Sequence, residues 1–198
     1  MADGREARLQ LIRSANVGPV TYAQLIARFG DAGAALEVLP MLAARGGGRA
    51  PQLADIGRVR REIERVERLG ARYVFRGEPD YPALLDEMET APPALIVRGR
   101  IDLAAGTVIA MVGARNASAA ACRFARQIAL GLGEAGATVV SGLARGIDTA
   151  AHIGSIGSGT IGVIASGIDI AFPPENAELQ ERVAHEGLLL AKIGRAHV

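Results

Sequence analysis

The sequence predicts an α/β fold: a doubly wound parallel sheet with a small all-α domain in front of it. Two observations support this class. Near-continuous apolar runs of strand length recur in the second half of the chain, as in strands buried on both faces. Segments with helical spacing separate them, and this alternation favours right-handed crossovers. Strands are expected at 107–112, 137–141, 160–165 and 187–191, and helices at 118–134, 147–157 and 175–186. The predicted sheet is incomplete on one side.

The first 70 residues predict a separate helical domain. Apolar residues recur at helical spacing between residues 5 and 39. Residues 16–21 interrupt them with a Val-Gly-Pro turn, and Thr21 can cap the helix that follows. This helix, turn and helix resemble a SAM-like or helix-hairpin-helix unit. Such a hairpin either presents backbone N–H groups to a phosphate or serves only for packing, and both alternatives stay open.

The segment that joins the helical domain to the sheet has three recognisable pieces. Residues 43–51 are rich in Gly and Arg and predict a linker. Residues 58–69 alternate basic and acidic side chains, which is typical of a solvated helix face with i,i+4 ion pairs. Short strands are expected at 71–75 and 94–98. The sheet domain is therefore expected to occupy residues 71–191.

Charge and cysteine content limit the classes of function. The net charge of the 198 residues is only +1, but residues 1–78 carry 13 Arg against 9 acidic residues, and residues 79–198 carry 9 basic against 12 acidic ones. A nucleic-acid role must therefore rest on a local site or on the N-terminal part. Cys122 is alone, which excludes a disulfide framework and a clustered zinc site. No segment resembles a signal peptide or a bilayer span, so a cytoplasmic protein without membrane contact is expected.

The turn after the strand at 137–141 is the first candidate site. Gly142 follows the strand directly, so the backbone can turn sharply and approach a ligand. The next helix would aim N–H groups beyond the carboxyl end of the strand, where open α/β sheets bind ligands. Ser141 offers a hydroxyl and Arg145 a charge. Asp148 is either a helix cap or part of the site, and His152 either reaches the crevice or packs.

The strand at 107–112 ends in a similar way. Gly113 breaks the apolar run, and Arg115 follows with a planar guanidinium that suits a phosphate. Asn116 or Ser118 can cap the following helix. The alternative for Arg115 is a surface salt bridge. Because parallel strands end at one edge of the sheet, the two strand ends predict a single anion-binding crevice.

A second glycine motif does not predict a cofactor. Residues 157–162 fit G-x-G-x-x-G, but a dinucleotide fingerprint needs a strand before it and a helix after it. Here a helix precedes and a strand follows, so the motif is a helix-to-strand turn. Residues 166–169 are also expected to make a turn. Apart from Asp148 and His152 there is no acid–base pair, nucleophile set or metal cluster, so the sequence favours binding over catalysis, with no cofactor and no metal.

Four motifs together resemble the DNA-processing protein A (DprA/Smf) family over roughly residues 80–191. They are V-G-A-R-N-A-S at 112–118, S-G-L-A-R-G-I-D-T-A-A-H at 141–152, G-T-I-G-V-I-A-S-G-I-D at 159–169 and F-P-P-E-N at 172–176. The resemblance implies an extended Rossmann fold that binds single-stranded DNA, protects incoming DNA and helps to load the RecA recombinase in natural transformation, with a homodimer in the full-length protein. The family's phosphate-binding residues correspond here to Gly113, Arg115, Ser141, Gly142, Gly146, Ile147 and Asp148.

The chain also departs from the family pattern. Ala121 stands where members often have a glycine. The R-N-R-containing segment, a second Ser-Gly-rich loop and a winged-helix domain belong beyond residue 191 and are absent, so a C-terminally truncated fragment is expected. The last six residues can be encoded by a nucleotide stretch common in sequencing adapters, and 192–198 are suspected to be a non-native tail.

An enzyme of the same general fold is the rival hypothesis. Phosphoribohydrolases that cleave nucleoside monophosphates carry a P-G-G-x-G-T loop followed by a catalytic Glu. That loop does not occur in residues 1–198.

Overall fold

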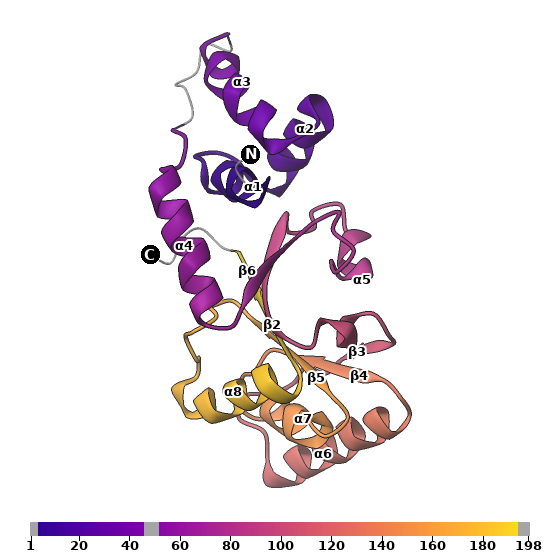
Figure 1. Cartoon of the computed structure of the whole chain (residues 1–198). Helices are drawn as coiled ribbons and strands as arrows, with labels where there is room; N and C mark the ends of the chain where they lie inside the picture. Colours follow the sequence, from indigo (N-terminus) through magenta and orange to yellow (C-terminus); the bar gives the residue numbers. More distant parts are fainter. Residues whose placement is uncertain (1–3, 46–51, 194–198) are drawn as a thin grey trace.

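A computed structural model describes residues 4–45 and 52–193 of the chain. Most of the predicted Gly/Arg-rich linker and of the suspected non-native tail lies outside these ranges. The described residues form a group of helices and a six-stranded mixed sheet with further helices packed on it (Figure 1). Among the described helices, none has both the length and the apolar composition needed to cross a bilayer.

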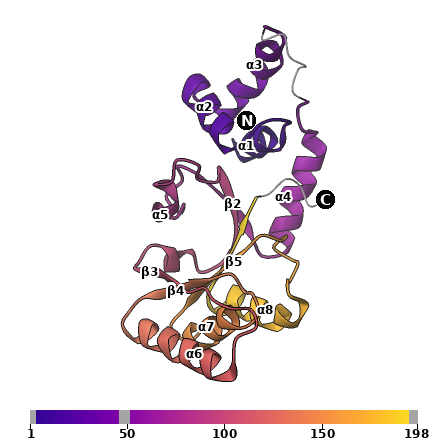
Figure 2. The same cartoon turned by 180° about the vertical axis from the view of Figure 1, so that it is seen from behind.

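Three helices form the N-terminal group, which lies at one end of the molecule (Figure 2). They are α1 (Gly4–Arg13), α2 (Pro19–Phe29) and α3 (Ala32–Arg45), and they share a core of their own that includes Leu11, Tyr22 and Leu25. Pro19 occupies the first turn of α2, where its missing N–H leaves no bond unmade. The helix α3 continues through Pro40 to Arg45, so it includes the first residues of the predicted linker.

The helix α4 (Ile56–Arg68) connects this group to the sheet. Asp55 caps it by accepting a hydrogen bond from Arg58 N at 2.8 Å. Val59 and Val66 pack into the same apolar cluster as sheet residues. The charged face makes one weak i,i+4 pair, Arg68–Glu64 at 4.0 Å, and its other ion pairs reach different elements. The predicted solvated face with i,i+4 pairs is therefore found only in part: most of its charged side chains are exposed, but ion pairs also reach α1 and the turn after β5. The domain boundary at residue 70 stays a prediction.

The sheet has the strand order β1-β2-β6-β5-β4-β3. The strands β3 (Val108–Ala110), β4 (Thr138–Ser141), β5 (Thr160–Ile164) and β6 (Leu188–Lys192) are parallel to one another. The strands β1 (Arg72–Phe75) and β2 (Ala94–Gly99) extend the sheet in antiparallel pairing. The predicted α/β class, with a largely parallel sheet behind an N-terminal helical domain, is confirmed.

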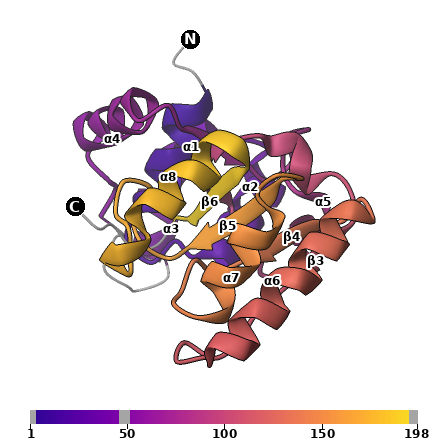
Figure 3. The same cartoon turned by 90° about the horizontal axis from the view of Figure 1, so that it is seen from below.

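The helices α6 (Ala119–Glu134), α7 (Ile147–Ser155) and α8 (Ala177–Glu186) join consecutive parallel strands and lie together on one face (Figure 3). Right-handed crossovers between strands added in one direction all fall on the same side. Within the described residues the parallel strands are thus wound in one direction only. The short helices α5 (Ala83–Asp86), η1 (Ile101–Ala104) and η2 (Pro174–Asn176) complete the structure.

Side chains of the central strands alternate between two apolar clusters. In β6, Leu189 and Ala191 join the cluster that includes residues of α4 and α8, whereas Leu188 and Leu190 pack with Tyr81 and other residues of the opposite face. This strand is buried on both faces, as its apolar run predicts. The edge strand β3 is only half-buried, since it has a neighbour on one side.

Candidate functional site

The carboxyl ends of β3 and β4 are tied to each other. The Ser141 hydroxyl donates to Met111 O at 2.7 Å, and Ile147 N donates to Ala114 O at 3.3 Å. The loop after β3 and the turn after β4 therefore form one local structure, as the sequence predicts. Residues 112–116 are exposed, so this structure is an open surface and not an enclosed pocket.

Two glycines allow the loop and the turn to touch. A Cβ on Gly146 would lie 2.3 Å from Ala114 O and 2.7 Å from Arg115 O, and its φ of +73° is strained for any other residue. A Cβ on Gly113 would lie 2.6 Å from the Ile147 side chain. The structure thus brings Gly113, Arg115, Gly146 and Ile147 together. Gly146 lies against the backbone of residues 114–115, and Gly113 lies against the side chain of Ile147.

Asp148 and Ser141 make their hydrogen bonds inside the protein. The Asp148 carboxylate is 7% exposed and accepts from Gly142 N at 3.2 Å and from Ala144 N at 3.4 Å. Both N–H groups belong to the turn before α7, and not to the helix whose N–H groups are predicted to face the ligand. The Ser141 hydroxyl is likewise committed to Met111 O. Both side chains hold the turn in shape.

Asn176 holds the same turn from the opposite side. Its Nδ2 group donates to Leu143 O at 2.8 Å, to Ala144 O at 3.3 Å and to Thr149 Oγ1 at 2.9 Å. Leu143 is buried with a φ of +56°, and this bond fixes the direction of its carbonyl. Sequence reasoning missed Asn176, because an asparagine directly before a helix is typical of a cap.

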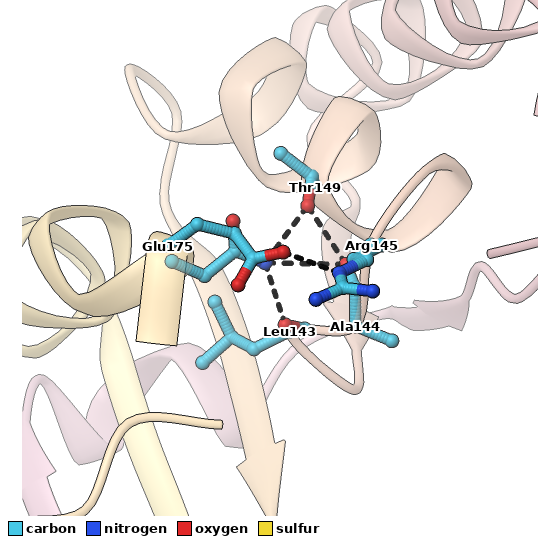
Figure 4. A network of polar contacts seen from close by, with 6 residues as sticks. Leu143, Ala144, Arg145, Thr149 and Glu175 are labelled. Carbon is cyan, nitrogen blue, oxygen red and sulfur yellow. Dashed lines mark hydrogen bonds and ion pairs between the residues drawn. The ribbon is translucent and has the colours of Figure 1, made fainter. Parts of the chain in front are cut away.

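The two arginines of the predicted site differ in their surroundings. Arg145 is ion-paired with Glu175 (Figure 4). Their hydrogen bond lowers the pKa of the Glu175 carboxyl. Arg115 is exposed and makes no ion pair within the described part of the chain. The backbone N–H groups of Gly113 and Arg115 are also without a partner among the described residues. Arg115 therefore has its full donor capacity available to an anion.

His152 does not reach this surface. Its side chain is fully buried, with Nδ1 2.9 Å from Thr160 Oγ1, and Nε2 has no partner among the described residues. Burial lowers its pKa to about 4, although Asp148 acts in the opposite direction. The imidazole is therefore neutral at pH 7 and serves for packing. Within residues 4–45 and 52–193, no group of three or more His, Cys, Asp or Glu side chains is arranged to hold a metal.

Comparison with curated proteins finds relatives that are longer than this chain. It is 36% identical over 136 residues to the protein Smf of Synechocystis sp., an alignment that covers 66% of this chain and 34% of the relative. It is 38% identical over 116 residues to the DNA processing protein DprA of Streptococcus pneumoniae, covering 58% and 41%. The aligned part therefore spans about a third to two-fifths of these relatives.

Two solved structures resemble the fold. The X-ray structure of DprA from Streptococcus pneumoniae matches with a TM-score of 0.65 and 26% identity, covering 90% of this chain and 57% of that one. A DprA structure from Helicobacter pylori, described for its single-stranded DNA binding mode, matches with a TM-score of 0.54 and 26% identity, covering 61% and 55%.

Family models match both parts of the chain. The model of a DprA-like N-terminal HHH domain matches residues 2–64. The model of DNA recombination-mediator protein A matches residues 72–197, which is more than half of the sequence. Because these two family models together cover most of the sequence, the chain belongs to the DNA recombination-mediator protein A (DprA) family.

Proposed function

We propose that the protein binds single-stranded DNA through its phosphates, at the joined ends of β3 and β4. This proposal rests on one observation. The Arg115 guanidinium is exposed and unpaired within the described residues, and it lies beside the free backbone N–H groups of residues 113 and 115, after the end of β3. A guanidinium can hold a phosphate with two parallel hydrogen bonds. The description of the Helicobacter pylori relative by its single-stranded DNA binding supports the choice of ligand.

The other predicted residues have different roles in this proposal. Gly113 contributes its backbone N–H, and Arg145 contacts a phosphate after exchanging Glu175 for it. The turn itself is held in position by supporting residues, namely Ser141, Gly146, Ile147, Asp148 and Asn176. Gly142 N is bonded to Asp148 and belongs with these supports. Only 4% of the residues are aromatic, so phosphate contacts dominate and binding depends strongly on salt.

The finer role rests on the family. We propose a cytoplasmic recombination mediator that protects incoming DNA and assists loading of RecA in natural transformation, with a homodimer formed by the full-length protein. Catalysis has no part in this proposal: Asp148 is engaged with the turn, and His152 is buried. The rival hypothesis, a nucleotide hydrolase of the phosphoribohydrolase type, predicts release of a base from a nucleoside monophosphate, and the purified chain is expected to release none.

Binding of fluorescent oligo-dT, titrated at several salt concentrations, tests the contact. Arg115→Ala is expected to weaken binding several-fold and to reduce the slope of log K against log salt by about 0.7, the loss of one single-strand phosphate contact. Arg100→Ala is the matched control. Arg100 is an exposed arginine next to Gly187, at the amino end of β6, where its loss is expected to leave binding unchanged. Equal affinity and slope for Arg115→Ala and the wild type would refute the assignment.

A further inference from the structure

A cleft of about 430 Å³ lies between α4 and the turn that follows β5. Its walls come from both parts of the molecule, because α4 precedes the sheet in sequence and the turn belongs to it. The charged side chains that α1, α4 and this turn contribute to the lining are Arg13, Arg58, Arg61, Glu62, Arg65 and Asp169. Four of these six side chains are basic.

Both acidic side chains of this set are already engaged. Arg13 Nη2 lies 2.5 Å from Glu62 Oε1, and Arg65 Nη2 lies 2.6 Å from Asp169 Oδ2. Arg65 thereby ties α4 to the turn after β5.

Arg58 and Arg61 remain without compensation. Both are exposed, and neither forms an ion pair within the described part of the chain. Together with Arg65 they occupy one face of α4, since these positions recur at helical spacing. Two uncompensated cations in one cleft repel each other and create a positive potential that attracts anions.

The topology places this cleft on the same edge as Arg115. The carboxyl ends of parallel strands share one edge of a sheet, and the turn after β5 lies two strand positions from the loop after β3. At a strand spacing of about 4.8 Å, these two ends are roughly 10 Å apart. A single nucleic-acid strand that follows this edge from Arg115 therefore arrives at α4.

We propose that Arg58 and Arg61 form a second phosphate-binding site for the same DNA strand, beside the turn after β5. The strand then runs along the carboxyl edge of the parallel sheet, held by Arg115 at one end and by α4 at the other. This inference takes its ligand from the proposed function, but it assigns a separate site on the helix that precedes the sheet.

The double variant Arg58→Ala/Arg61→Ala tests the second site in the whole chain. Its matched control is Arg100→Ala/Arg182→Ala, which removes the same charge from exposed positions outside the cleft. Two oligo-dT lengths of about 4 and about 16 nucleotides represent the range of single-strand site sizes. For the long oligonucleotide, the cleft variant is expected to bind several-fold more weakly, with a salt slope lower by about 1.4. The short oligonucleotide is expected to bind the cleft variant with the same affinity as the wild type. The Arg115→Ala variant is expected to bind both oligonucleotides more weakly than the wild type.

The outcomes separate this inference from the proposed function. If the cleft variant binds the long oligonucleotide with wild-type affinity and slope while Arg115→Ala does not, the second site is refuted and the first one stands. If the wild type binds neither length, both proposals fail. If free dTMP binds the wild type but not the cleft variant, and oligonucleotide binding is equal in the two, the cleft is a mononucleotide site and the strand path is refuted.

Discussion

His152 makes the stability of the protein depend on pH. Its imidazole is buried between α7 and β5, and desolvation lowers its pKa from 6.5 to about 4. In the unfolded chain the same group titrates near 6.5. Between these two values the unfolded state binds more protons than the folded state, so the free energy of unfolding falls as the pH falls. The neutral His152 imidazole makes its full contribution to the free energy of unfolding above about pH 6.5, and this contribution is lost by about pH 4.

The size of the effect follows from the two pKa values. A difference of about 2.5 between them, at 1.36 kcal/mol for each pKa unit, corresponds to about 3 kcal/mol. This is a large part of the 5–15 kcal/mol by which typical domains are stable. Acidification alone is therefore expected to lower the urea midpoint substantially.

Urea denaturation of the wild type and of His152→Asn between about pH 7 and pH 4.5 measures this contribution. The asparagine amide can still donate to Thr160, but it never ionises. We expect the variant to be less stable at pH 7 and to lose about 2–3 kcal/mol less on acidification. The carboxyl groups titrate in both proteins and cancel in the comparison. Equal pH dependence of the two proteins would refute the assignment to His152.

Two further variants test the strand-end surface. Gly146→Ala places a Cβ against Ala114 O at a positive φ, so it is expected to destabilise the fold by about 2 kcal/mol or more in thermal unfolding; an unchanged midpoint would contradict the close contact. Glu175→Gln removes the charge that holds Arg145, so oligo-dT is expected to bind more tightly, with a salt slope steeper by about 0.7. A variant with wild-type affinity and slope would show that Arg145 contacts no phosphate.

The sequence predicted the positions of the parallel strands well because buried strands need long apolar runs. Each of the four strands begins and ends no more than two residues from its predicted bounds. The extent of α3 was missed because it continues past Pro40, a residue that normally ends a helix. The pairing of β2 with β6, through which β1 also joins the sheet, depends on contacts between distant segments, and no local pattern contains that information.

The site was predictable where its chemistry depends on backbone shape. Gly113 was predicted from the break in its apolar run and Gly146 from the family motif, and the structure shows that a Cβ at either position would collide with its neighbours. The direct ligand roles of Ser141 and Asp148 stay predictions, because a hydroxyl or carboxylate that shapes a turn has the same sequence pattern as one that faces a ligand. The arginine face of α4 was interpreted as solvated, since a sequence does not show which helix face borders a cleft.

The bonds from Asn176 to Leu143 and Ala144 also have a consequence for the order in which the protein matures. The donor Asn176 lies 33 residues after Leu143, beyond β5 and directly before α8. The backbone of the turn after β4 is therefore completed only when a later segment has been synthesised and has docked. A nascent chain that ends before Asn176 contains both strand ends but not this support. The shape of this surface thus depends on three successive strand–helix units.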